Sequence, residues 1–181
     1  MTTIIIIAVV AVLVLWVISV QNKLVKKDEL CKNALKQINV QQVTRYDALK
    51  ALVKLTREYS SYEADTLQKV IEARKITSSA APTVEEIAAN EKVLNSALSR
   101  LIAVAEQYPD LKASANYRDT MDSLKGYEEN VRLSRMTFND TVTAYNREVR
   151  MFPASLVAGI LNFPQREYLA EDTTKTEYPE I

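Results

Sequence analysis

An unbroken apolar run near the start of the chain predicts a membrane-spanning helix. From Ile4 to Val20 the only polar side chain is that of Ser19. At a helical rise of about 1.5 Å per residue this run is about 25 Å long, close to the thickness that a membrane helix must cross. No Lys or Arg precedes the run and no small-residue cleavage site follows it, so we expect an uncleaved anchor rather than a signal peptide.

Beyond this run, hydrophobic residues recur at spacings of three and four, the period of amphipathic helices. Thr83 and Glu86 match the pattern of a capping box, and Pro109 biases the residue before it out of helical geometry. We therefore expect helical segments over residues 21–43, 47–77, 83–107, about 110–152 and 154–161.

The most regular pattern lies in the fourth of these segments, where apolar positions alternate at spacings of four and three. Such a heptad seam indicates a long helix that packs against other helices. The seam consists of Tyr117, Met121, Leu124, Glu128, Val131, Arg135, Phe138, Val142, Tyr145, Val149 and Phe152.

Helices that each carry an apolar stripe must bury it against one another. The pattern thus predicts an all-α fold, in which an N-terminal transmembrane helix precedes a long antiparallel four-helix bundle of the up-and-down type. We assign residues 1–22 to the anchor, 23–163 to the bundle and 164–181 to a tail. The tail has five acidic and two basic residues and no periodicity, so we expect it to be disordered.

The composition narrows the possible functions. The chain has 23 basic and 23 acidic residues, so the strong basic excess of a nucleic-acid binder is missing. It has no histidine, only two glycines, and one cysteine, Cys31. Histidine-based triads, phosphate-binding glycine loops and cysteine metal clusters therefore find no support. We expect a protein that is not an enzyme and has no cofactor, no catalytic residues and no metal site.

Charged residues on the apolar stripes are the first candidate site. Glu63, Glu91, Glu128 and Arg135 all fall on predicted stripes, where an unpaired charge is costly. We interpret them as a buried polar network that fixes helix register, and a ligand or metal site is the alternative. Arg74 and Arg100 are candidate partners for the glutamates, and Glu63 or Glu106 for Arg135.

Two asparagines one heptad apart are the second candidate site. Asn139 follows Phe138, and Asn146 follows Tyr145. This repeat could form an interaction stripe for a partner. The alternative is that the aromatics belong to the core and the asparagines merely flank them.

The charges beside the anchor predict an orientation. Lys23, Lys26 and Lys27 follow the apolar run, and no Lys or Arg precedes it. The positive-inside rule then places the short N-terminus outside and the bundle in the cytoplasm of a single-pass protein. The lipid bilayer is the first expected partner, and these lysines could also contact anionic headgroups.

Three segments together resemble the LemA family of bacterial membrane proteins. The strongest is Glu106-x-Tyr108-Pro109-x-Leu111-Lys112-Ala113. The second holds Glu128, Arg135 and the two aromatic–Asn pairs, followed by Phe152-Pro153 and Gly159. The third and weaker one holds Arg45, Asp47, Leu52, Val53, Glu63 and Ala73-Arg74.

The resemblance implies an N-terminal membrane helix and a bundle of long helices, and it defines no catalytic residues. This chain departs from the family pattern at Lys50-Ala51, where a proline is usual, so the first two helices could run on as one. We expect a membrane-anchored interaction or scaffold protein of the bacterial cell envelope that binds an unidentified protein. The alternative is an envelope sensor that binds a ligand or metal through the Glu/Arg cluster.

Overall fold

The computed structural model describes residues 1–61, 64–65, 67–68 and 82–170 of the 181-residue chain. These residues form helices and no strand, which confirms the predicted all-α class. The helices are α1 (Thr2–Thr56), α3 (Val84–Gln107), α4 (Pro109–Ala113), α5 (Ala115–Arg150) and α6 (Ala154–Ile160).

The longest element is α1, a single helix of 55 residues. A break between residues 43 and 47 was expected, and this prediction is wrong. No Gly or Pro interrupts this stretch, and the Thr44 hydroxyl donates to the Val40 carbonyl at 3.2 Å within the helix instead of capping a new one. The anchor and the first bundle helix are therefore one continuous element.

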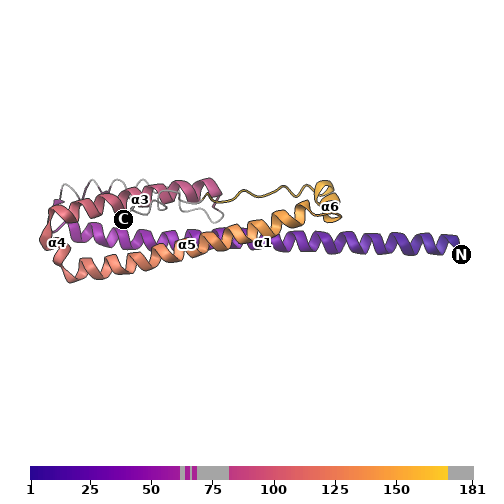
Figure 1. The fold of residues 1–181 in the computed structure, drawn as a ribbon, viewed down its shortest axis with the longest axis horizontal. Helices are drawn as coiled ribbons and strands as arrows, with labels where there is room; N and C mark the ends of the chain where they lie inside the picture. The colour runs from indigo at the N-terminus through magenta and orange to yellow at the C-terminus, as the bar shows by residue number, and fades with distance from the viewer. Residues whose placement is uncertain (62–63, 66, 69–81, 171–181) are drawn as a thin grey trace, which may run out of the picture.

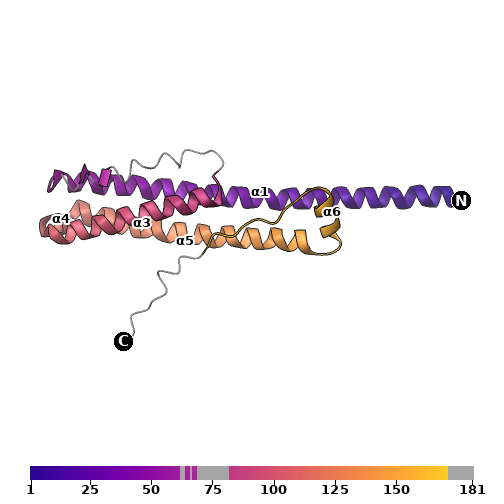
Figure 2. The same ribbon diagram turned by 90° about the horizontal axis from the view of Figure 1, so that it is seen from above.

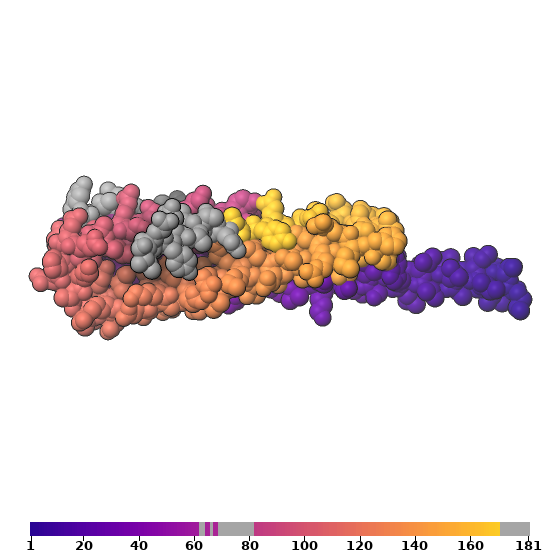
Figure 3. All heavy atoms as spheres, in the orientation of Figure 1, coloured from indigo at the N-terminus to yellow at the C-terminus, as the bar shows by residue number. Residues whose placement is uncertain are grey.

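The helices form an elongated rod in which α5 runs antiparallel along α1 (Figure 1). In the other view α3 lies against the part of α1 that is remote from the N-terminus, and α4 joins α3 to α5 at that distal end (Figure 2). The N-terminal part of α1 extends beyond the rest of the molecule (Figure 3). The anchor region thus stands free, and every packed element lies on one side of it.

Local signals account for the boundaries of the other helices. The capping box at α3 is confirmed, since the Glu86 N–H donates to Thr83 Oγ1 at 3.2 Å and the Thr83 N–H to Glu86 Oε2 at 2.9 Å. A single helix from about residue 110 was expected, but the chain breaks at Ser114, which has ψ 138°. The Ser114 hydroxyl accepts from the Tyr117 N–H at 3.2 Å and so begins a new helix, α5.

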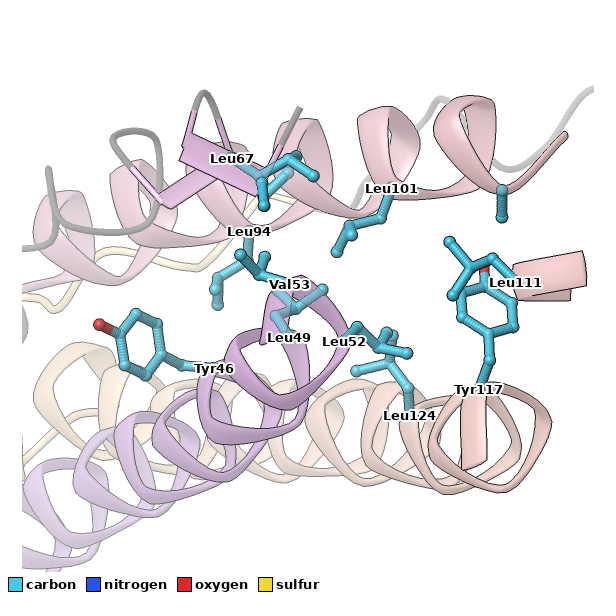
Figure 4. Close-up of a cluster of buried hydrophobic side chains, with 13 residues drawn as sticks. Tyr46, Leu49, Leu52, Val53, Leu67, Leu94, Leu101, Leu111, Tyr117 and Leu124 are labelled. Carbon is cyan, nitrogen blue, oxygen red and sulfur yellow. The ribbon is translucent and has the colours of Figure 1, made fainter. Parts of the chain in front are cut away.

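Two apolar clusters fill the rod. The distal core joins α1, α3, α4 and α5, and Figure 4 shows how its leucines and two tyrosines converge from these helices. The proximal core, nearer the anchor, lies around Cys31, Leu35 and Ile38 of α1 and Phe138, Val142 and Tyr145 of α5, with Ile87 and Leu169 completing it. The two cores are therefore built from partly different elements.

Part of the chain between α1 and α3 also packs on the distal core. Ala64 and Leu67 are helical and buried there. The predicted helix over residues 47–77 is thus divided, because residues 47–56 belong to α1 and residues 69–77 lie outside the described residues. A full fourth bundle helix stays a prediction.

The C-terminal part of the chain reverses direction after α6. Asn162 has φ 55°, and the Phe163 N–H donates to the Ala158 carbonyl at 2.9 Å, which together close α6 and turn the chain. Residues 164–170 then run back along α5 as an extended segment (Figure 1). Disorder was expected from residue 164 on, and this is wrong for residues 164–170; residues 171–181 lie outside the described residues.

Candidate functional site

A layer of charged and amide side chains separates the two cores. Arg45 of α1 has only 1% of its side chain exposed and forms an ion pair with Glu128 of α5. The Arg45 guanidinium also donates to Asn95 Oδ1 of α3 at 2.6 Å. This arginine therefore contacts groups on both neighbouring helices at the level where the apolar packing is interrupted.

A second ion pair lies beside the first. Arg135 of α5 pairs with Glu91 of α3, and both side chains are largely buried. The same guanidinium donates to the carbonyl of Ala170, at the end of the extended segment. Arg135 therefore links the polar layer to residues 164–170.

The structure changes the composition of the predicted polar network. Arg100 and Glu106 lie exposed on α3, and the observed partners of Glu128 and Arg135 are Arg45 and Glu91 instead. Glu63 and Arg74 lie outside the described residues. Arg45 was not among the predicted network members because the expected helix break hid its place on a continuous seam. On one helix its heptad spacing to Ile38 and Leu52 identifies it.

Asn139 and Asn146 hold the extended segment by its backbone. Asn146 Nδ2 donates to the Arg166 carbonyl at 2.9 Å, and the Arg166 N–H donates back to Asn146 Oδ1 at 2.8 Å. Asn139 makes the same pair of bonds with Leu169, both at 3.0 Å. The predicted stripe thus has an occupant in this structure, and that occupant is the chain's own C-terminal segment.

The spacing of this amide clamp, Asn139 and Asn146, matches the geometry of an extended chain. One heptad of helix rises about 10.5 Å, and three residues of extended chain, from Arg166 to Leu169, span about 10 Å. Both functional groups of each amide are used on one residue, as in the pairing of two strands. All four hydrogen bonds of the clamp are made to the backbone of the segment and none to its side chains.

Side-chain contacts give the segment its specificity. Arg166 Nε donates to Asp28 Oδ1 at 2.6 Å, and its guanidinium lies 5.9 Å from the centre of the Tyr145 ring. Leu169 is buried in the proximal core, and the Tyr145 hydroxyl donates to the Pro164 carbonyl at 3.0 Å. We call this site, formed by α1 and α5 around the segment, the segment groove.

The electrostatics of the groove favour ionised carboxylates. Burial raises the pKa of Asp28, but hydrogen bonds from Lys32 and Arg166 outweigh this and hold it below its usual value. Hydrogen bonds from Lys23 and Lys27 likewise lower the pKa of Glu148, near the end of α5. Both carboxylates therefore stay charged and paired at neutral pH.

Two features of the groove bear on its chemistry. Cys31 lies beneath it in the proximal core, where burial raises the pKa of its thiol and disfavours the nucleophilic thiolate. Among the residues that the structure describes, no group of three or more His, Cys, Asp or Glu side chains could hold a metal ion.

The N-terminal part of α1 has the length and composition to cross a membrane. Its most apolar 18-residue window has a mean hydropathy of 3.1, and none of the residues that the structure describes buries it. Because exposing such a window to water would be very unfavourable, the helix is suited to a lipid environment.

Comparisons with known proteins agree with these features. The chain is similar to magnetosome protein MamQ 2 of Paramagnetospirillum magneticum, with 36% identity over 75 residues, or 41% of this chain and 28% of that protein. Magnetosome protein MamQ of Magnetospirillum gryphiswaldense gives 35% identity over the same shares. The match thus spans less than a third of the length of these relatives. The profile of the LemA family matches residues 34–181, and the chain therefore belongs to the LemA family.

Proposed function

We propose that this LemA-family chain is a non-enzymatic interaction protein, a scaffold anchored by α1 in the membrane of the bacterial cell envelope. One observation carries the proposal: Asn139 and Asn146 form a clamp for an extended polypeptide. A clamp that uses both atoms of each amide is a means of binding a chain, and it has no role in bond cleavage.

The occupant of the groove in the scaffold is the same segment of a second copy of the chain. The groove fits this sequence in particular, because Arg166 meets Asp28 and Leu169 enters the proximal core. Only residues 161–163 connect the segment to α6, so a change in these few residues would direct it to a neighbour. Anchoring in one membrane raises the local concentration of copies and favours such exchange.

The polar layer supports this function over that of a ligand or metal sensor. Glu128 faces Arg45, and Glu91 faces Arg135, so two of the acidic groups that a cation would need are already neutralised. Removing either arginine would also break an ion pair between side chains that are at least three-quarters buried. The layer is thus suited to holding α1, α3 and α5 in register beside the groove.

Photocrosslinking between two tagged copies tests the proposal. Tyr168 is half exposed on the segment, so p-benzoylphenylalanine is placed there in one copy, and a second copy with a different tag is co-expressed. We expect crosslinks between the two tags in membranes. Asn139→Ala with Asn146→Ala in the second copy alone should abolish them, and the photoreactive residue at Leu133, an exposed site on α5, is the position control.

Each outcome of this experiment decides the question. Crosslinks between tags that depend on the clamp of the receiving copy support the scaffold. Crosslinks confined to one chain, or crosslinks between tags that survive the double substitution, overturn it. A clamp-dependent crosslink to a different protein would keep an interaction function and exclude self-exchange.

The side of the membrane is a further part of the proposal. The lysines that follow the apolar run favour a cytoplasmic bundle, with the short N-terminus outside. An alkaline phosphatase fused after Ile181 should then be inactive in intact cells, whereas a green fluorescent protein at the same site should fluoresce. An active phosphatase fusion would reverse the orientation.

A further inference from the structure

A corner without charges lies where α5 ends. From Met151 to Phe163 no residue is charged, although charged residues make up 25% of the chain. Phe152 is 78% exposed and Ile160 is 83% exposed. Met151, Leu156 and Leu161 also face outward, so large apolar side chains dominate this surface.

The orientation of α6 is the reverse of that of an ordinary surface helix. Its small side chains, Ala154 and Ala158, are buried together with Val157, whereas Leu156 and Ile160 point away from the protein. A helix in water normally turns its large apolar residues inward. Packing against the rod therefore gives no reason for large apolar side chains at positions 156 and 160. Contiguous exposed apolar patches of this kind mark interaction sites.

The register of the helices places this corner at the level where α1 leaves its apolar run. Glu148 of α5 receives ion pairs from Lys23 at 2.8 Å and Lys27 at 2.9 Å. Since α5 runs antiparallel to α1 and ends at Arg150, the corner begins at about the level of residues 20–23. Figures 1 and 2 both show α6 beside α1 where the free part of α1 begins.

We propose that this corner, residues 151–161, is a second membrane contact, inserted in the interfacial layer of the same bilayer that α1 crosses. The bilayer is the expected binding partner of this surface because the corner lies next to the anchor. When residues 4–20 span the membrane, an apolar surface at this level is in contact with lipid. Lys23, Lys26 and Arg150 are exposed at about the same level of the rod, so anionic headgroups would meet basic side chains at this depth.

Two contacts restrict the rod in a way that one helix cannot. A single transmembrane helix leaves rotation about its own axis open. A lipid contact on the side of α1 where α6 lies defines which face of the rod is turned towards the bilayer, and it limits the tilt. The segment groove, which begins directly after α6, is thereby held near the membrane surface.

Depth-dependent fluorescence quenching tests this contact in the full-length protein. Single cysteines replace Leu156, Ile160 or Leu133 in a Cys31→Ala background, and each carries an NBD fluorophore. Leu133 is the matched control, an exposed leucine in the middle of α5. The proteins are reconstituted in phosphatidylcholine vesicles that contain phosphatidylglycerol, with a nitroxide-bearing lipid or with iodide on both sides.

We expect the labels at residues 156 and 160 to emit at shorter wavelength and to lose most of their fluorescence to the nitroxide lipid. The label at residue 133 should respond mainly to iodide. Equal iodide quenching at all three sites would overturn the proposal. A second outcome would also overturn the proposal. In this outcome the nitroxide lipid quenches residues 156 and 160 only weakly, and their blue shift disappears as the protein is diluted into more lipid. The corner would then contact another copy of the chain instead of lipid.

Discussion

The two apolar cores of the rod are enclosed in different ways. Residues of α1, α3, α4 and α5 line the distal core, and short connections at α4 join α3 to α5. The proximal core lies beyond much of α3, and part of its cover is Leu169 on an extended segment. A helix of the bundle can detach only if the bundle unfolds, whereas we expect the extended segment to detach while the helices stay folded. Replacing one buried leucine should therefore affect the stability of the protein differently in the two cores.

The largest expected effect concerns the layer between the cores. Arg45→Ala removes the ion pair between Arg45 and Glu128 and should destabilise the rod by about 3 kcal/mol, the lower end of the range for breaking a buried pair, since Glu128 keeps some contact with water. Chemical denaturation of the reconstituted protein, followed by circular dichroism, measures this. Arg100→Ala, at an exposed arginine, should change stability by less than about 0.5 kcal/mol. Equal losses of stability in Arg45→Ala and Arg100→Ala would mean that the ion pair of Arg45 does not stabilise the rod.

A matched pair of leucines compares the two cores directly. Leu52 in the distal core and Leu169 in the segment are 0% and 2% exposed. Leu52→Ala should lower global stability by about 3 kcal/mol, because the cavity lies among helices. Leu169→Ala should leave the global transition nearly unchanged and instead raise hydrogen exchange in residues 164–170. If both substitutions lower the free energy of global unfolding equally, the segment unfolds together with the rod, and the two cores do not differ in this respect.

The amide clamp should act locally as well. Asn139→Ala with Asn146→Ala removes four hydrogen bonds to the segment, each worth about 1 kcal/mol. We expect the backbone amides of Arg166 and Leu169 to exchange at least about 10-fold faster, since about 1.4 kcal/mol corresponds to a factor of ten. Asn130→Ala, at an exposed position of α5, is the control and should leave them unchanged. Protection that survives the double substitution would show that side chains alone hold the segment.

Acid should release the segment before it affects the distal core. The folded pKa of Asp28 lies below its ordinary value of 3.8, so its ion pair with Arg166 stabilises the bound segment above that pH. This contribution is lost as the pH falls through the folded pKa. The protection factors of residues 164–170, which are corrected for the intrinsic effect of pH on exchange, should therefore fall at acid pH in the parent. The uncharged variant Asp28→Asn should exchange faster at neutral pH and show a weaker response to acid.

The smallest effect is expected at the turn that directs the segment back. Asn162 has a positive φ, which glycine adopts without strain and β-branched residues adopt poorly. Asn162→Gly should change stability by only a few tenths of a kcal/mol, whereas Asn162→Val should cost about 1 kcal/mol or more. In the crosslinking experiment Asn162→Val should also raise exchange between copies. Equal stability of the two variants would show that the positive φ at residue 162 does not help to direct the segment.

Helix positions were predictable from sequence where local signals were explicit. Thr83 and Glu86 marked the beginning of α3 correctly, and Pro109 marked its end. The seam of α5 identified most of its buried positions, although Phe152 lies beyond the helix and is exposed. The break at Ser114 was missed because one serine cap gives a weak signal within a long apolar periodicity.

The site was harder to predict, because its partners come from distant parts of the chain. Asn139 and Asn146 stood out by their spacing, but their ligand is a polar segment without periodicity, which sequence alone describes as disordered. Arg45 became recognisable only on an unbroken α1. Pairings such as Arg166 with Asp28 depend on tertiary geometry, so neither residue type nor spacing indicates them.

The continuity of α1 determines how far from the bilayer the protein can act. From Val20 to Thr56 the helix has no interruption, which corresponds to a height of about 54 Å at the helical rise. No hinge separates the lipid-embedded part from the distal core, so a tilt of the anchor by a few degrees would displace α4 sideways by several ångströms. The distal end of the rod would therefore move together with the anchor, because one rigid helix connects them.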